Sequence, residues 1–181
     1  NNRQEGVKMF LYLAMIDSDA DKSKFEILYS EYKNLMYYTA NRILHNSSDA
    51  EDVVHQAFLK VIEILDTISS PRCHKTRALL VTITEHKAID LYREKQRRNV
   101  LPLAEEYIGA APAAEIERLA ERDTLAAAIA SLPPRYRSVL LLRYDCGYSN
   151  AEIANILDTT EPNVRKLIQR AKEKLSAALS G

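Results

Sequence analysis

The spacing of apolar residues is the feature that most constrains how this chain folds. Apolar side chains recur every three or four positions almost throughout, which is the repeat of an amphipathic helix. No segment alternates polar and apolar residues for long enough to predict a strand. The clearest stripe comprises Phe25, Leu28, Tyr29, Tyr32, Leu35, Met36 and Ile43. We therefore predict an all-α protein.

The first half of the chain contains three predicted helices, of which the stripe at residues 25–43 forms the first. Ser48 and Glu51 have the spacing of a capping box, in which each side chain satisfies a free amide at a helix start. The helix that follows carries an apolar side made of Val53, Val54, Ala57, Phe58, Val61, Ile62 and Leu65. Asp66–Lys75 is rich in turn residues and is predicted as a loop. A third helix is expected from about Thr76 to Arg98.

A change of composition after residue 98 predicts a linker. Two prolines and a glycine interrupt residues 99–114, and irregular stretches of this length are uncommon inside compact domains. A long loop within one domain is the alternative interpretation. We expect two small helical domains, at residues 1–98 and 115–181, joined by a flexible linker at 99–114.

The C-terminal segment is predicted to be a helix-turn-helix unit preceded by two helices. The preceding helices span Glu115–Ser131 and Pro134–Tyr144, because proline is tolerated in a first helical turn and not deeper. Ser149 and Glu152 form a second capping box, which begins a short helix. A three-residue turn separates this short helix from a last helix at about Glu161–Leu179.

The last helix has an apolar seam and an opposite face of polar and basic side chains. Such groups bind base edges and phosphates when they lie near the start of a recognition helix in the major groove. An ordinary solvated face on a helical hairpin is the alternative interpretation. The residues predicted to contact DNA are Glu161, Asn163, Arg165, Lys166, Gln169 and Arg170.

Charge is balanced over the whole chain but uneven along it. The chain has 25 Lys and Arg against 25 Asp and Glu, so it is not built to coat nucleic acid by bulk charge. Residues 71–98 carry eight basic against three acidic side chains, whereas residues 31–70 carry three basic against six acidic ones. One domain therefore combines a basic and an acidic face, which suits a protein that bridges a basic partner and nucleic acid.

Other function classes lack their usual signatures. No apolar stretch approaches the ~20 residues of a membrane-spanning helix. No glycine-rich phosphate loop, nucleophile motif or plausible carboxylate pair predicts an enzyme. The pairs Glu51/His55 and His86/Asp90 have no third ligand nearby, so we expect no metal site and no cofactor. Two cysteines are too few for a disulfide framework, which indicates a reduced, cytoplasmic setting.

Two details of the sequence leave alternatives open. Cys73 lies between Arg72 and His74, a setting that lowers a thiol pKa and permits redox sensing. Such a cysteine is more often an ordinary loop residue. The chain begins with Asn1 rather than Met, which indicates a trimmed or partial sequence.

Separate segments of the chain resemble the sigma factors of bacterial RNA polymerase, in the order that this family has them. Asp49–Lys60 is similar to the family's polymerase-binding helix, which reads Asp-Ala-Glu-Asp, two apolar residues, Gln-Glu and then an aromatic residue. Leu79–Arg93 is similar to the promoter-melting helix. Leu132–Arg137 and Ser149–Leu175 resemble the upstream-promoter domain. These segments form two blocks joined only by a short linker. This arrangement resembles the extracytoplasmic-function sigma factors of the sigma-70 family.

The resemblance implies an alternative sigma factor that binds core RNA polymerase and directs promoter-specific initiation. The clamp helices of the polymerase would contact Asp49, Asp52, His55 and Gln56. The residues implied in binding the minus-ten element are Ser70, Arg72, Lys75, His86, Lys87, Asp90, Arg93 and Arg97. The DNA-facing residues of the last helix would read the minus-thirty-five element. Promoter DNA and an anti-sigma factor are expected as further partners.

A stand-alone helix-turn-helix regulator is the alternative function. Such a protein binds an operator without polymerase, which explains residues 115–181 but gives the helix at Asp49–Lys60 no role. A sigma factor, by contrast, binds promoter duplex poorly until core polymerase is present. Binding of the free protein to its DNA site therefore separates the two functions.

Overall fold

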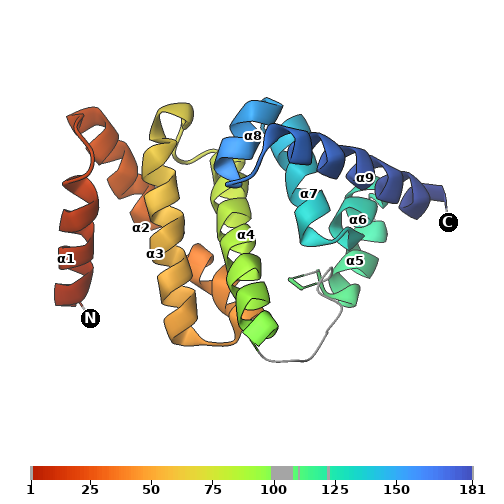
Figure 1. Ribbon diagram of the computed structural model, residues 1–181, viewed down its shortest axis with the longest axis horizontal. Coiled ribbons are helices and arrows are strands. Elements are labelled where there is room, and N and C mark those ends of the chain that lie inside the picture. The colour runs from red at the N-terminus through yellow and green to blue at the C-terminus, as the bar shows by residue number, and fades with distance from the viewer. Residues whose placement is uncertain (1, 99–107, 110, 122, 181) are drawn as a thin grey trace. The chain divides into compact units, whose positions relative to one another are not determined.

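The structure is a computed structural model that describes residues 2–98, 108–109, 111–121 and 123–180, with side chains from residue 5 onward (Figure 1). Within these ranges every regular element is helical, and the all-α prediction is confirmed. The elements are α1 (Asn2–Leu13), α2 (Asp19–Leu44), α3 (Ser47–Glu63), the 3-10 turn η1 (Leu65–Thr67), α4 (His74–Arg98), α5 (Ala113–Ala120), α6 (Thr124–Ser131), α7 (Pro134–Leu140), the π-helical turn η3 (Leu141–Asp145), α8 (Asn150–Ile156) and α9 (Glu161–Ser180).

Contacts divide the chain into two compact units, Asn1–Ala88 and Ile89–Gly181. The division falls within α4, which continues as one helix through that point. Most of the predicted linker at 99–114 lies outside the described residues. Its last two residues already belong to α5, which begins at Ala113.

An aromatic cluster forms the core of the first unit where α1, α2 and α3 meet. Tyr12, Phe25, Tyr29 and Phe58 pack with ring centroids 4.9 to 6.4 Å apart. Phe25 and Phe58 are completely buried. Aromatic pairs at these distances contribute ~0.5–1.5 kcal/mol beyond the area they bury. This cluster therefore fixes all three helices against one another.

The predicted capping box at the start of α3 is wrong. Asn46 is the N-cap instead, and its side-chain oxygen accepts a hydrogen bond from the backbone N–H of Asp49 at 3.0 Å. The cap lies two residues earlier because His45 adopts a left-handed conformation (φ 50°) that ends α2 and turns the chain at once. Glu51 is free of the helix start, and its carboxylate lies 3.9 Å from Lys8 Nζ.

Two predicted helix limits in the first unit need correction. The predicted loop at Asp66–Lys75 begins inside η1, and α4 starts at His74 rather than at Thr76. Cys73 precedes α4, and its sulfur accepts a hydrogen bond from the backbone N–H of Thr76 at 3.4 Å. This contact satisfies a free amide in the first turn, which explains the earlier start.

The helix predicted at Glu115–Ser131 is two helices, α5 and α6. Asp123 separates them, because its carboxylate accepts hydrogen bonds from the backbone N–H groups of Leu125 and Ala126 at 2.9 and 3.2 Å. A side chain that caps a new helix start competes with continuation of the preceding helix. The short apolar helix α6 then buries Ala127 and Ala128.

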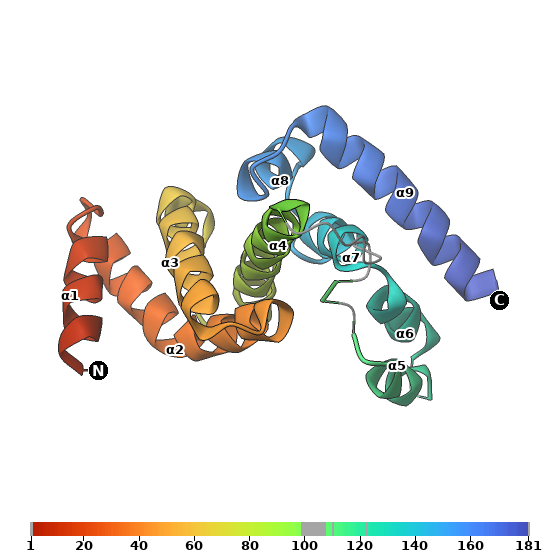
Figure 2. The same cartoon turned by 60° about the horizontal axis from the view of Figure 1, so that its bottom comes forward.

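The predicted helix-turn-helix is present in the second unit (Figure 2). The capping box between Ser149 and Glu152 is confirmed in both directions, and α8 begins directly after Ser149. Asp158 adopts a left-handed conformation (φ 50°) in the turn, which an aspartate tolerates better than most residues. Thr160 caps α9 weakly, with its hydroxyl 3.4 Å from the N–H of Asn163.

Candidate functional site

The polar face of α9 lies where the sequence predicts it. Val164, Leu167 and Ala171 are buried, so the opposite side of the helix faces solvent. Four of the predicted DNA-contacting side chains are exposed, namely Arg165, Lys166, Gln169 and Arg170. The two at the helix start, Glu161 and Asn163, are half-buried. A helix start with this composition suits contact with base edges.

Several of these side chains are oriented by bonds within α9 or its preceding turn. The pairs are Arg165 Nη1 with Glu161 Oε1 at 2.6 Å, Asn163 Nδ2 with Thr159 Oγ1 at 2.8 Å, and Gln169 Nε2 with Glu173 Oε1 at 3.2 Å. Among the described residues, Lys166 and Arg170 make no such pair. The face therefore combines oriented groups that suit base edges with exposed cations that suit phosphates.

A hollow of about 330 Å³ lies beside this face and includes residues that the sequence analysis did not single out. Its lining contains three cations and no acid. The polar and aromatic residues that line it are Arg143, Tyr144, Asn150, Arg165, Gln169 and Lys172. Lys172 Nζ lies 5.2 Å from the centroid of the Tyr144 ring. The helical repeat of α9 predicts Lys172 on this side, whereas Arg143 comes from η3 and no local pattern identifies it.

The loop before α4 is held from several sides. The hydroxyl of Tyr32 donates to the carbonyl of Pro71 at 2.9 Å, and the hydroxyl of Thr76 donates to the carbonyl of Ser70 at 2.6 Å. Ser70, Arg72 and Lys75 are all exposed. The backbone is thus anchored while the three predicted side chains project outward. Arg72 Nε also lies 3.0 Å from Glu31 Oε1 in an exposed ion pair.

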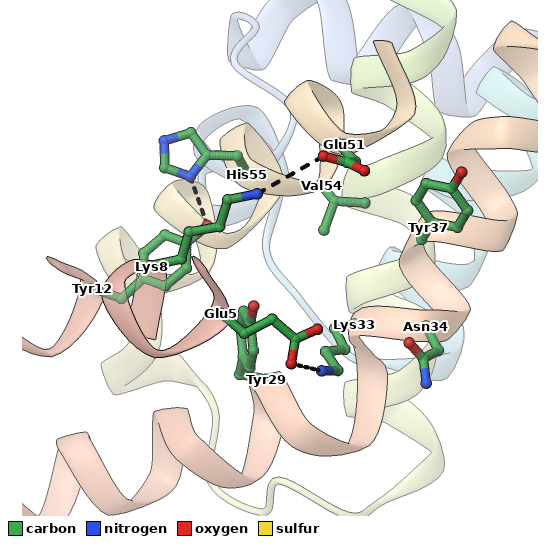
Figure 3. Close-up of a pocket in the computed structure, with 10 residues that line it drawn as sticks. All are labelled: Glu5, Lys8, Tyr12, Tyr29, Lys33, Asn34, Tyr37, Glu51, Val54 and His55. Carbon is green, nitrogen blue, oxygen red and sulfur yellow. Dashed lines mark hydrogen bonds and ion pairs between the residues drawn. The ribbon is translucent and has the colours of Figure 1, made fainter. Parts of the chain in front are cut away.

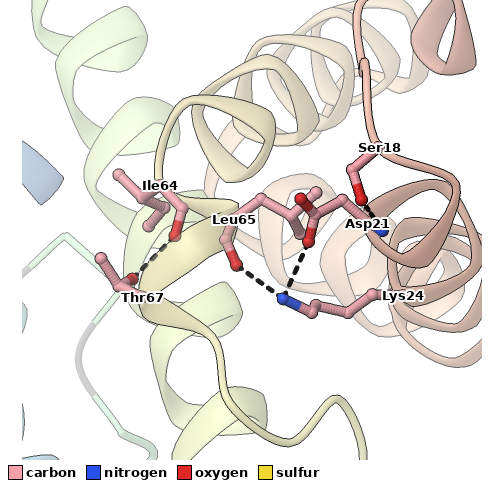
Figure 4. Close-up of polar contacts among 6 residues, drawn as sticks. All are labelled: Ser18, Asp21, Lys24, Ile64, Leu65 and Thr67. Atoms are coloured by element: carbon pink, nitrogen blue, oxygen red, sulfur yellow. Dashed lines mark hydrogen bonds and ion pairs between the residues drawn. The ribbon is translucent and has the colours of Figure 1, made fainter.

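The start of α2 secures the other end of this connection (Figure 4). Lys24 Nζ donates to the carbonyl of Leu65 at 3.2 Å and lies 3.1 Å from Asp21 Oδ1. The hydroxyl of Thr67 donates to the carbonyl of Ile64 at 2.7 Å. These contacts satisfy backbone carbonyl groups where α3 ends, and they fix the path of the chain from α3 into the loop.

Four of the five residues predicted on α4 lie on one side of this helix. His86, Asp90, Arg93 and Arg97 follow one another at spacings of four, three and four, which places them in one stripe. Lys87 lies about a quarter of a turn away. Asp90 and Arg97 are exposed, whereas the other three are half-buried.

The acidic face of α3 contains the four residues predicted to bind polymerase. Asp52, His55 and Gln56 are exposed, and Asp49 is half-buried near the helix start. The buried side of the same helix holds Val53, Ala57, Phe58 and Val61. Because one side is fixed in the core, the polar side has a single orientation.

α1 covers one edge of this face, which the sequence analysis did not predict (Figure 3). Tyr12 Oη lies 2.6 Å from His55 Nδ1, and Lys8 Nζ lies 3.9 Å from Glu51 Oε2. On the α2 side, Lys33 Nζ lies 2.9 Å from Glu5 Oε2. Residues 9–16 form an unbroken apolar run with no helical period, and the residues before them are mostly polar, so no local signal predicted α1.

Two pKa shifts follow from these contacts. Burial, with a smaller contribution from Tyr29, raises the pKa of the Tyr12 hydroxyl well above its usual value, so Tyr12 keeps its proton. Hydrogen bonds with the side chain and the backbone N–H of Thr76 lower the pKa of the Cys73 thiol. In the described part of the chain, no three His, Cys, Asp or Glu side chains gather in a group that could hold a metal ion.

The chain is similar to a known protein family over two separate segments. Residues 28–98 match the family described as Sigma-70 region 2, and residues 122–175 match the one described as Sigma-70, region 4. The first segment contains α3, the following loop and α4. The second contains α6 to α8 and most of α9.

Individual relatives match along most of their length. The chain is 27% identical over 171 residues to the ECF RNA polymerase sigma factor SigW of Bacillus subtilis, covering 88% of this chain and 90% of the relative. It is 26% identical over 162 residues to the ECF RNA polymerase sigma factor SigL of Mycobacterium tuberculosis, covering 88% and 91%. A solved structure of CnrH in complex with the cytosolic domain of CnrY aligns over 96% of both chains at 25% identity, with a TM-score of 0.39. None of the described helices is both long enough and apolar enough to cross a membrane.

Proposed function

This chain belongs to the extracytoplasmic-function group of the sigma-70 family, and we propose that three of its surfaces divide the contacts of transcription initiation. It is an alternative sigma factor that directs transcription with RNA polymerase. The family acts in initiation rather than as enzymes. The observation that carries the proposal is the exposed polar face of α9 in a capped helix-turn-helix, within the segment that matches region 4.

The acidic face of α3 binds the clamp helices of core RNA polymerase in this proposal. Asp52, His55 and Gln56 are exposed on a helix that the core of the first unit holds in place. A surface with this charge pairs with basic side chains, which steers association and fixes the register of the complex. Asp49 supports the same contact from the first turn of the helix.

The anchored loop and α4 bind the minus-ten element. A base taken out of the stack costs a few kcal/mol, which a preformed site offsets better than a mobile one. Ser70 offers hydrogen bonds to such a base from a backbone that Tyr32 and Thr76 hold. The cations that neutralise the phosphates of the opened strand are Arg72, Lys75, Lys87, Arg93 and Arg97. His86 and Asp90 add hydrogen-bonding groups on the α4 stripe.

The face of α9 reads the minus-thirty-five element as duplex DNA. Asn163, Arg165 and Gln169 are oriented by their neighbours and suit base edges, while Lys166 and Arg170 suit phosphates. Glu161 orients Arg165 and accepts from cytosine where the sequence places one. The hollow with Arg143 and Lys172 takes a backbone phosphate beside these bases.

An anti-sigma factor is a further partner in this proposal. A protein that covers the α3 face or the α9 face prevents the contacts described above, and the exposed charges on both offer specific recognition. We place the chain in the cytoplasm, where polymerase and promoters are.

Run-off transcription tests the proposal. Core RNA polymerase is supplied with a panel of candidate promoters, with and without this protein. Specific transcripts that require the protein support it. If core polymerase is bound in a pull-down but no transcript forms, the promoters in the panel are wrong or melting is defective. If core polymerase is not bound and the free protein binds a DNA site unaided, the chain acts as a stand-alone regulator and the proposal fails.

A further inference from the structure

α1 exposes a set of large apolar residues on the side away from the core. Its charged residues Glu5 and Lys8 point inward and pair with Lys33 and Glu51. Tyr12 lies in the aromatic core, but several other apolar residues of α1 and of the turn after it are exposed to solvent. The outward residues, here called the α1 stripe, are Val7, Phe10, Leu11 and Met15, with exposed fractions of 58%, 72%, 57% and 58%. The stripe accounts for half of the exposed large hydrophobic residues in the described part of the chain.

The α1 stripe is presented on a docked helix rather than on a loose tail. Tyr12 is 2% exposed within the aromatic core, and Ile16 in the following turn is 7% exposed. The bond between Tyr12 and His55 ties the same helix to α3. The stripe is therefore held outward by the core, so it costs little conformational entropy to present to a partner.

The stripe is too small to support an interface of its own. A stable interface buries about 800 Å² on each partner. Four partly exposed side chains offer only part of that area. An exposed apolar patch of this size on a docked element is commonly functional. The α1 stripe is thus expected to be one edge of a larger contact surface.

The larger surface next to the stripe is the acidic face of α3. Leu11 follows Lys8 by three positions, so it lies on the α3 side of α1, and Met15 lies in the turn that follows the helix. Lys8 and Tyr12 contact Glu51 and His55 on that side. The surface therefore passes directly from apolar residues of α1 to polar residues of α3. A polar rim beside an apolar patch is the usual anatomy of a protein interface.

We propose that α1 is part of the polymerase-binding surface, and that its apolar stripe packs against an apolar patch of core RNA polymerase beside the site for α3. This inference rests on the proposed role of the α3 face. Leu11 is the anchor, because it is exposed and lies on the α3 side of α1, and Phe10 extends the apolar surface away from it. Tyr12 and Lys8 hold the two parts of the surface in register.

Binding of the full chain to core RNA polymerase tests the inference, with Phe10→Ser and Leu11→Ser as separate variants. Each is expected to weaken binding roughly tenfold. Leu179→Ser is the matched control, since Leu179 is 45% exposed on α9, and this substitution is expected to leave core binding unchanged. Circular dichroism confirms that helicity is retained, as expected for exposed positions. Unchanged core affinity in both α1 variants overturns the inference.

Asp52→Arg separates this inference from the function on which it rests. If Asp52→Arg abolishes core binding and both α1 variants bind normally, only the inference about α1 is wrong. If Asp52→Arg binds normally, or the wild-type chain does not bind, the role of α3 fails and the inference with it. Two further results also overturn the inference. If the wild-type chain forms a dimer in sedimentation and Phe10→Ser dissociates it, the stripe binds a second copy of the chain. If the wild-type chain binds phosphatidylglycerol vesicles and Phe10→Ser removes this binding, the stripe binds a lipid surface.

Discussion

The polar faces of α3 and α9 differ in what holds their side chains. On α9, the side-chain bonds that orient the DNA-facing residues stay within the helix or its preceding turn, as in Glu161–Arg165 and Thr159–Asn163. On α3, His55 is bonded to Tyr12 of another helix, and the neighbouring Glu51 pairs with Lys8. A face organised by one helix acts as a local module. The α3 face is organised in part by another helix, at His55 and Glu51.

The largest expected effect tests whether the aromatic core of the first unit holds α3 and its polar face in place. Phe58→Ala is expected to lower the free energy of unfolding of this unit by about 3–5 kcal/mol, because it empties the centre of the aromatic cluster. Chemical denaturation followed by circular dichroism measures this. Phe10→Ala is the matched control, since Phe10 is 72% exposed and its removal changes stability by less than about 0.5 kcal/mol. Equal losses in the two variants would contradict the assigned core.

Reversal of one charge on α3 tests that face without disturbing the core. Asp52→Arg is expected to weaken core polymerase binding roughly a hundredfold, or about 2.7 kcal/mol, because it places a cation opposite basic side chains. Equilibrium binding to core polymerase measures it. Glu26→Arg on α2 is the control, an exposed acid outside the predicted face. Normal affinity in Asp52→Arg with normal helicity would remove α3 from the interface.

Loss of a cation on or beside α9 tests the DNA-facing side of this helix, and it is expected to lower affinity less than Asp52→Arg does. Lys166→Ala and Arg143→Ala should each weaken holoenzyme binding to a minus-thirty-five duplex about five- to tenfold and lower the slope of log affinity against log salt by about one. Arg118→Ala on α5 is the matched control, exposed but remote in sequence from the hollow. An unaltered slope in Arg143→Ala would mean that the hollow takes no phosphate.

The two cysteines give the smallest expected difference between the units. The lowered pKa of Cys73 means a larger thiolate fraction at pH 7, so iodoacetamide should modify Cys73 several-fold faster than Cys146. The rate of Cys73 modification plotted against pH should have its midpoint below the usual pKa of a thiol. Thr76→Val should raise that midpoint, whereas Thr76→Ser retains the hydroxyl and should not. An unchanged midpoint in Thr76→Val would show that the Thr76 contacts do not stabilise the thiolate.

Local signals predicted the second unit better than the first. The capping box at Ser149 and Glu152 and the face of α9 both follow from residues at most four positions apart, so the sequence contains all the information they need. The apolar pattern predicts one helix through Asp123, although a lone Asp before an apolar run is itself a capping signal. Arg143 joins the α9 face from η3 and has no local signal.

Competition between neighbouring caps explains the wrong start predicted for α3. Asn46 and Ser48 are both good N-caps, and the choice depends on where α2 ends, which the left-handed His45 decides. In the sequence, Ser48 with Glu51 matches the capping box, so Ser48 is as good an N-cap candidate as Asn46. The pattern alone therefore cannot place the helix start.

The amino-acid sequence by itself determined the helical fold, the helix-turn-helix and the DNA-facing side of α9, because each depends on a short-range repeat. Only the tertiary structure decided how the α3 face is built. Tyr12 and His55 are 43 residues apart, and no periodic pattern brings them together. Their contact exists because Phe25, Tyr29 and Phe58 bury Tyr12 between the helices, and burial of apolar surface depends on which elements meet in space rather than on sequence spacing.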